Sequence, residues 1–132
     1  MAGLHLDSPG LIKMKTLDEA QTHLQRIHAV VEQYAMAVKR NQPSTVFMMN
    51  LRRQLPSLAE NLKNQFGMIS DQITQLNLTT SRGGSENQRV RVLREGVAHI
   101  RQSLEIAVTQ TKDRHAVKDG KADAPVDEAG DS

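Results

Sequence analysis

Five histidines are the side chains here that most often carry chemistry, because imidazole binds metals and moves protons near neutral pH. They are His5, His23, His28, His99 and His115. A metal-binding pair on one helix face needs a spacing of four residues, as in H-E-x-x-H. His23 and His28 are five residues apart and fall on different faces of a helix, so this spacing predicts no metal site. The sequence contains no cysteine, which removes thiolate zinc sites and thiol nucleophiles.

The carboxylates fall at helix starts or away from apolar positions, where charge is normally solvated. They include Asp18, Glu19, Glu32, Glu60, Asp71, Glu86, Glu95 and Glu105. No pair lies in an apolar surrounding that would suit acid–base catalysis, and no serine stands in a nucleophile-elbow motif. Gly83-Gly84 precedes a helix and could hold an anion, but a simple turn explains it better. We therefore expect no enzyme, no catalytic residue and no cofactor.

Arginines make one part of the chain locally basic. They are Arg82, Arg89, Arg91, Arg94 and Arg101. Such a cluster can contact nucleic acid through phosphates, but it lacks interleaved aromatic residues and a recognition-helix motif. A solvated flank of a coiled coil, or contacts with acidic partner helices, explains these arginines better. Direct binding of nucleic acid is therefore not expected.

These residues must be positioned by helices, because apolar residues recur in steps of three and four, the pattern of a coiled-coil seam. Thr16-Leu17-Asp18-Glu19 resembles a capping box that starts the first helix, and Asn41-Gln42-Pro43 ends it. Ser85-Glu86-Asn87-Gln88 is a second capping box and starts the last helix after a loop near residues 78–84. The first seam contains Leu17, Ala20, Leu24, Ile27, Val31, Tyr34 and Val38, and the last contains Val90, Leu93, Val97, Ile100, Leu104, Ala107 and Thr111.

The middle segment, from about residue 44 to 76, has a seam with one irregular step. Two consecutive steps of four around Leu62 and Phe66 form a stutter, which locally unwinds a supercoil. Pro56 disrupts a helix interior at a cost of about 3 kcal/mol. Two interpretations remain open: one helix kinked at Pro56, or a short helix followed by a longer one with Pro56 in its first turn. The kink is preferred, because the seam passes Pro56 without losing phase.

Length and composition limit the fold class. The 132 residues fit one domain, and 2% aromatic residues make a β-sandwich or barrel improbable. No apolar run approaches the about 18 residues of a membrane span, and the first residues do not form a secretory signal. The net charge of +2 indicates no particular partner. We expect a flexible segment at 1–15, a helical coiled-coil domain at 16–111 and a disordered acidic tail at 112–132.

The predicted fold is all-α: an elongated three-helix coiled-coil bundle with a long C-terminal helical hairpin and disordered termini. Each seam is a thin stripe that buries little surface, so we expect helices of another chain to complete the core. The seam residues are then the candidate partner interface. They are Leu24, Ile27, Val31, Tyr34, Leu58, Leu62, Phe66, Ile69, Ile73, Val90, Leu93, Val97, Ile100 and Leu104.

Three stretches carry a resemblance to a known family: HLQRIHAVVEQYAMAV, LAENLKNQFGMISDQI and ENQRVRVLREGVAHIRQSLEIAV, within about residues 23–110. In their order they resemble the small helical subunits of the eukaryotic Mediator complex, most closely the ninth-subunit family of the middle module. The eleventh-subunit family of the head module is a weaker match. Pro56 departs from the pattern. The resemblance implies a non-catalytic, nuclear coactivator subunit that links transcription factors to RNA polymerase II and packs against other Mediator subunits.

Other partners fit the same physical pattern. The chain is alternatively a coiled-coil adaptor or tethering subunit of another helical complex, or a self-associating bacterial helical bundle. In each case we expect other helical proteins as partners, with no small-molecule substrate and no membrane. Outside a Mediator-like role the expected location is intracellular and soluble. The identity and stoichiometry of the partners do not follow from the sequence.

Overall fold

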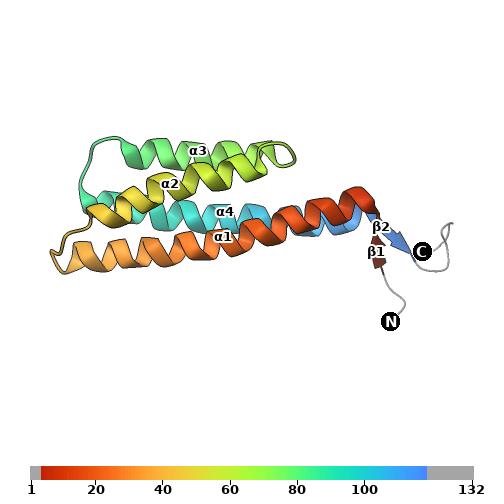
Figure 1. Ribbon diagram of the computed structural model, residues 1–132, viewed down its shortest axis with the longest axis horizontal. Helices are drawn as coiled ribbons and strands as arrows, with labels where there is room; N and C mark the ends of the chain where they lie inside the picture. Colours follow the sequence, from red (N-terminus) through yellow and green to blue (C-terminus); the bar gives the residue numbers. More distant parts are fainter. Residues whose placement is uncertain (1–3, 119–132) are drawn as a thin grey trace.

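In a computed structural model, which describes residues 4–118, the chain forms a bundle of four helices (Figure 1). The elements are β1 (Leu4–Leu6), α1 (Ser8–Lys39), α2 (Thr45–Leu62), α3 (Gly67–Ser81), α4 (Glu86–Arg114) and β2 (Ala116–Lys118). The all-α prediction is confirmed. The predicted count of three helices is wrong, because the middle segment forms two helices instead of one.

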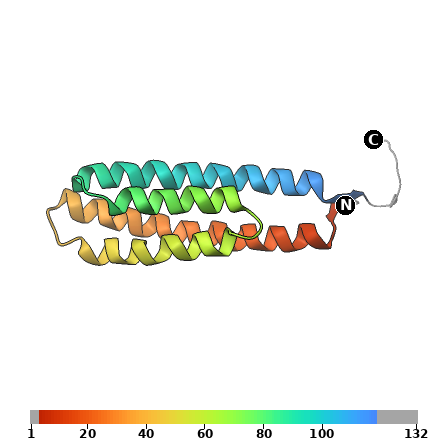
Figure 2. The same cartoon turned by 90° about the horizontal axis from the view of Figure 1, so that it is seen from above.

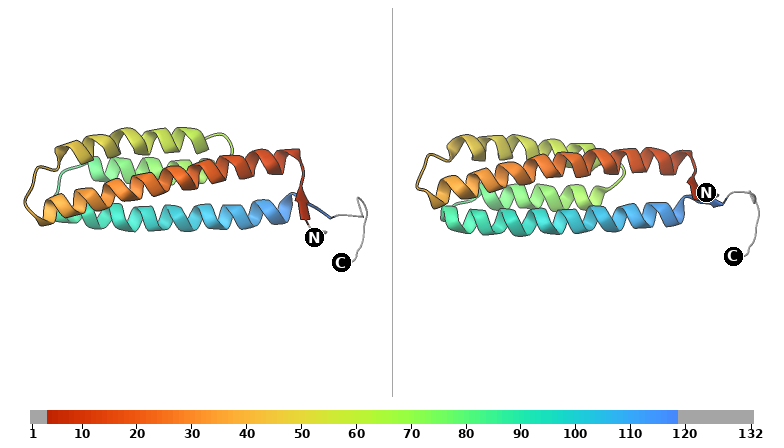
Figure 3. Two further views of the ribbon diagram at one scale, coloured as in Figure 1. Left: turned by 60° about the horizontal axis from the view of Figure 1, so that its bottom comes forward. Right: turned by 90° about the horizontal axis from the view of Figure 1, so that it is seen from below.

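The helices run alternately up and down the long axis of the molecule (Figure 2). Helix α1 packs against α2 and α4, and α3 packs against the same two helices, so the ring of contacts closes within one chain. Both further views show α1 and α4 side by side over most of their length (Figure 3). Strands β1 and β2 pair antiparallel, with His5 opposite Val117, and join the two ends of the described chain.

Helix α1 begins eight residues before the predicted start at Thr16. Asp7 caps it, because its carboxylate accepts a hydrogen bond from the backbone N–H of Gly10 at 2.8 Å. Pro9 stands in the first turn, where a missing N–H costs nothing. Thr16 lies inside the helix and its hydroxyl donates to the Ile12 carbonyl. The prediction of a flexible segment is therefore wrong for residues 8–15.

The break in the middle segment lies at residues 63–66, and neither interpretation of Pro56 is correct. Pro56 lies in the interior of α2, with its side chain exposed. The chain reverses where the seam stutters, just before Gly67, the first residue of α3. Helices α2 and α3 then pack antiparallel, and Ser70 of α3 donates a buried hydrogen bond to the Ala59 carbonyl of α2 at 2.8 Å. This reversal supplies the fourth helix.

The seam residues of all four helices meet in a single core. The largest fully buried side chains are Tyr34, Leu17, Ile27, Leu51, Leu55, Leu58, Leu62, Ile73, Leu93, Ile100, Leu104 and Val31. Most of the predicted interface residues thus pack inside their own chain, contrary to the expectation that another chain would complete the core. The reason is the turn at residues 63–66, because four stripes enclose an interior that three would leave open.

Helix α4 begins as predicted and ends later. Ser85 and Gln88 form the capping box, with both hydrogen bonds at 3.1 Å. The helix continues to Arg114 and β2 follows, so the prediction of a disordered tail from residue 112 is wrong as far as Lys118. The remainder of that predicted tail, residues 119–132, lies outside the described residues.

Candidate binding groove at the end of the bundle

Helix lengths leave one end of the bundle incomplete. Helices α1 and α4 have 32 and 29 residues, whereas α2 and α3 have 18 and 15. At about 1.5 Å per residue, α1 and α4 exceed their neighbours by roughly 20 Å. At the end that carries both termini, these two helices therefore continue beyond the turn between α2 and α3 (Figure 2).

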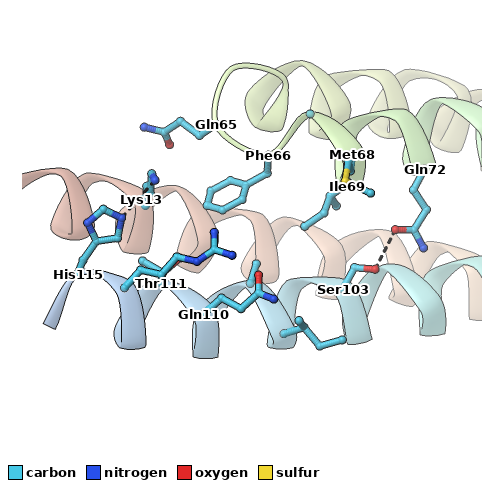
Figure 4. A pocket seen from close by; sticks show the side chains of 14 residues that line it. Lys13, Gln65, Phe66, Met68, Ile69, Gln72, Ser103, Gln110, Thr111 and His115 are labelled. Atoms are coloured by element: carbon cyan, nitrogen blue, oxygen red, sulfur yellow. Dashed lines mark hydrogen bonds between the residues drawn. The ribbon is translucent and has the colours of Figure 1, made fainter.

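A groove of about 500 Å³ lies at this step, between the start of α3 and the last turns of α4 (Figure 4). Lys13 and His115 stand at one end, and a hydrogen bond from the Ser103 hydroxyl to Gln72 at 2.9 Å marks the other. The lining residues are Lys13, Gln65, Phe66, Gly67, Met68, Ile69, Gln72, Ser103, Ile106, Ala107, Gln110, Thr111, Arg114 and His115.

Large apolar side chains are exposed at this groove. Met68 is 88% exposed and Ile106 is 58% exposed, one on α3 and the other on α4. Phe66 reaches from the turn toward α1 and α4 and is half-buried (Figure 4). Exposed apolar groups that gather at a concave surface are typical of a binding site for another molecule.

A chain of hydrogen bonds fixes the terminal end of the groove. Lys13 Nζ lies 3.2 Å from His115 Nε2, and His115 Nδ1 lies 2.9 Å from Asp7 Oδ1. A lysine ammonium can only donate, so Nε2 accepts in this arrangement and Nδ1–H donates to the carboxylate. The backbone N–H of Asp7 also donates to the His115 carbonyl at 3.0 Å. These contacts join the start of α1 to the end of α4, and we call them the terminal clasp.

The terminal clasp contains an Asp–His pair, which in hydrolases activates a nucleophile. Its third member is Lys13, and a protonated amine has no lone pair with which to attack a substrate. The array instead holds a cation at the mouth of the groove and orients the His115 ring. These three residues thus order the start of α1 against the end of α4.

The charge of the groove is one-sided. Lys13 and Arg114 bring positive charge to its lining. Among the described residues that line the groove there is no aspartate or glutamate. A ligand that complements this surface carries acidic groups together with small or medium apolar ones.

The predicted interface residues fall in two places. Phe66 and Ile69 line the groove, whereas Val90 is partly buried near the far end and the other predicted residues are in the core. Sequence analysis did not identify Met68, Ile106 and Lys13, which also line the groove. For Met68 and Ile106 a signal existed, because each is a large apolar residue just off its seam and therefore has no place in the core.

The basic cluster is partly used within the bundle. Arg94 donates from Nε and Nη2 to the two carboxylate oxygens of Glu32 on α1, at 3.0 and 2.7 Å. This hydrogen bonding lowers the pKa of Glu32 and raises that of Arg94. The bidentate pair spans α1 and α4 on the surface, so Arg94 acts as a link between helices.

Among residues 4–118, no group of three or more His, Asp or Glu side chains is placed to hold a metal ion. None of the helices in this range is both long and apolar enough to span a membrane. Comparison with known proteins gives no significant match to a family model, to a curated protein or to a solved structure.

Proposed function

We propose that the chain is a non-catalytic subunit of a larger protein assembly and holds its partner in the groove between α3 and α4. The observation that carries this proposal is the pair Met68 and Ile106, exposed on either side of a concave and basic surface. Burying such side chains contributes about 25 cal/mol per Å² of apolar surface. The partner is a protein segment with apolar and acidic side chains, as charge complementarity with Lys13 and Arg114 requires.

The closed core supports this reading over assembly through the seams. A seam residue such as Ile100 is fully buried, so a partner reaches it only if the bundle opens. Opening the bundle costs a large part of the free energy of folding, whereas the groove is accessible in the folded chain. The Mediator assignment remains a prediction based on the sequence resemblance.

The test compares two pairs of exposed apolar residues. Met68→Asp and Ile106→Asp place a charge in the groove, while Val46→Asp and Met49→Asp do the same on α2, where the native residues are 66% and 61% exposed. Each tagged variant is purified from cells that make the protein, and the bound proteins are identified by mass spectrometry. Circular dichroism confirms that each variant is folded.

We expect the wild type and both α2 variants to retain the same partner and both groove variants to lose it. Retention by the groove variants, or equal loss by all four, contradicts the proposal. Recovery of RNA polymerase II coactivator subunits supports the Mediator resemblance, and a partner set without them ends it. Binding to a purified partner should weaken as salt rises, because the groove is basic.

A further inference from the structure

We infer that the chain's own acidic C-terminal segment, residues 119–132, docks into the groove and competes with the partner. This inference rests on the proposed function of the groove. The segment reads DGKADAPVDEAGDS and carries five acidic residues and one lysine. Small apolar residues, including Ala124, Pro125 and Val126, stand among the acidic ones. This composition is the chemistry that the groove complements.

The point at which the described chain ends favours this occupant. β2 ends at Lys118, three residues after His115, which lines the groove. The next two residues are Asp119-Gly120, a dipeptide that favours a turn. Strand β2 leads away from the bundle (Figure 1), so a docked segment requires a change of direction directly after Lys118, where this dipeptide stands.

The segment is long enough to fill the groove. The twelve residues 121–132 span up to about 40 Å when extended, at about 3.3 Å per residue. The groove follows α4 from His115 to Ser103, which is about 18 Å along the helix axis. Even after retracing the three residues of β2, the segment passes Arg114 and Lys13 and reaches Ile106 and Met68.

Attachment to the bundle compensates for weak contacts. A segment tethered by a short linker experiences an effective concentration in the millimolar range. Surface ion pairs contribute little individually, so a segment of this kind binds weakly as a free peptide and still occupies the groove when attached. A partner must displace it, which makes the segment an intramolecular competitor.

The experiment uses methionine methyl groups as reporters in solution NMR. Met68 reports on the groove, and Met36 and Met49 are exposed methionines elsewhere. Spectra are recorded for the full chain and for a chain that ends at Lys118. We expect the Met68 signal to differ between the two chains and the signals of Met36 and Met49 to coincide. Adding a peptide of residues 119–132 to the shortened chain should move the Met68 signal saturably toward its position in the full chain.

Charge variants provide the matched control. Arg114→Glu should weaken peptide binding several-fold and shift the Met68 signal of the full chain toward that of the shortened chain. Arg101→Glu changes an exposed arginine of the same helix that does not line the groove. It should leave peptide binding and the Met68 signal of the full chain unchanged. A peptide with its carboxylates replaced by amides should bind more weakly than the acidic one.

Three results overturn the inference. They are a Met68 signal that is identical in the two chains, an amide peptide that binds as well as the acidic one, and a Met68 shift that disappears on dilution. The last result indicates a second copy of the chain in the groove. If the Met68 signal is identical but partner capture still depends on Met68, the inference fails and the proposed function stands. If the signal moves but no partner depends on Met68, the proposed function fails instead.

Discussion

Gly10 lies where the start of α1 packs closely against the end of α4. A Cβ added at this position would overlap the Cβ of His115, which is attached directly to the backbone. Gly67, in contrast, has no atom within 4 Å of such a Cβ. The need for glycine at position 10 therefore comes from a tertiary contact and from the terminal clasp.

Gly10→Ala should lower the free energy of unfolding by about 1–3 kcal/mol, because overpacking outweighs the gain in helix propensity. Gly67→Ala should leave it unchanged or raise it slightly, since α3 begins there in open space. Urea denaturation followed by circular dichroism measures both. A Gly10→Ala variant as stable as the wild type would show that the two helix ends are not held together as described.

The Glu32–Arg94 pair gives a pH-dependent prediction. The pKa of Glu32 is lowered in the folded chain by its hydrogen bond to Arg94. The pair's contribution is therefore complete above the ordinary glutamate range and is lost as the pH falls through the lowered pKa. Because the side chains are 42% and 52% exposed, that contribution is below about 1 kcal/mol.

Glu32→Gln should thus reduce stability slightly at neutral pH and converge with the wild type in acid. Urea denaturation across this range measures the difference, with Glu60→Gln, an exposed glutamate of α2, as the control. A difference between Glu32→Gln and the wild type that grows as the pH falls would contradict the assignment, since protonation removes the charge in both the folded and unfolded chains.

At the scale of elements, Pro56 is the unfavourable residue in α2. It provides no N–H for the carbonyl of Arg52, and its ring crowds that carbonyl. Pro56→Ala should raise the free energy of unfolding by about 1–2 kcal/mol. Removing the proline relieves a cost to the folded helix of up to about 3 kcal/mol. It also makes the unfolded chain more flexible, which lowers stability by about 0.4–1 kcal/mol.

Thermal and urea unfolding of Pro56→Ala and of Ser57→Ala, its exposed neighbour, test this prediction. The serine variant should change stability by less than about 0.5 kcal/mol. A less stable Pro56→Ala variant would mean that a bend at this proline is required for α2 to follow α1 and α3.

The apolar seams predict the buried residues well, but they do not predict how many helices contain these residues. Leu24, Ile27 and Val31 were assigned correctly to an apolar face, because helical periodicity fixes the face that is buried. The seams do not predict the turn at residues 63–66, although the stutter lies at this position. A stutter is compatible both with a continuous helix and with a chain reversal. Only the packing of α3 on α2 decides between these two structures.

The start of α1 and the groove depend on contacts between distant residues. Pro9-Gly10, a dipeptide typical of turns and loops, forms the first turn of a helix that is capped by Asp7 and packed on His115. The groove exists because α1 and α4 are longer than α2 and α3. This difference in length can be predicted only when the turn at residues 63–66 is known. No local pattern indicates that Lys13 and His115 meet across almost the whole chain.

At the scale of the whole molecule, one chain closes its own four-helix core. The opposite expectation, that thin seams require a second chain, follows from three helices and not from four. With the core closed, Met68 and Ile106 remain exposed at the groove, and we propose this groove as the surface that binds a partner.

The most direct test of this claim is the dependence of urea unfolding on the concentration of the purified chain, combined with sedimentation equilibrium. We predict a single species of 14.7 kDa and a cooperative transition whose midpoint does not change with protein concentration. A larger species whose midpoint rises with concentration would show that the core is completed between chains, and would contradict a core closed within one chain.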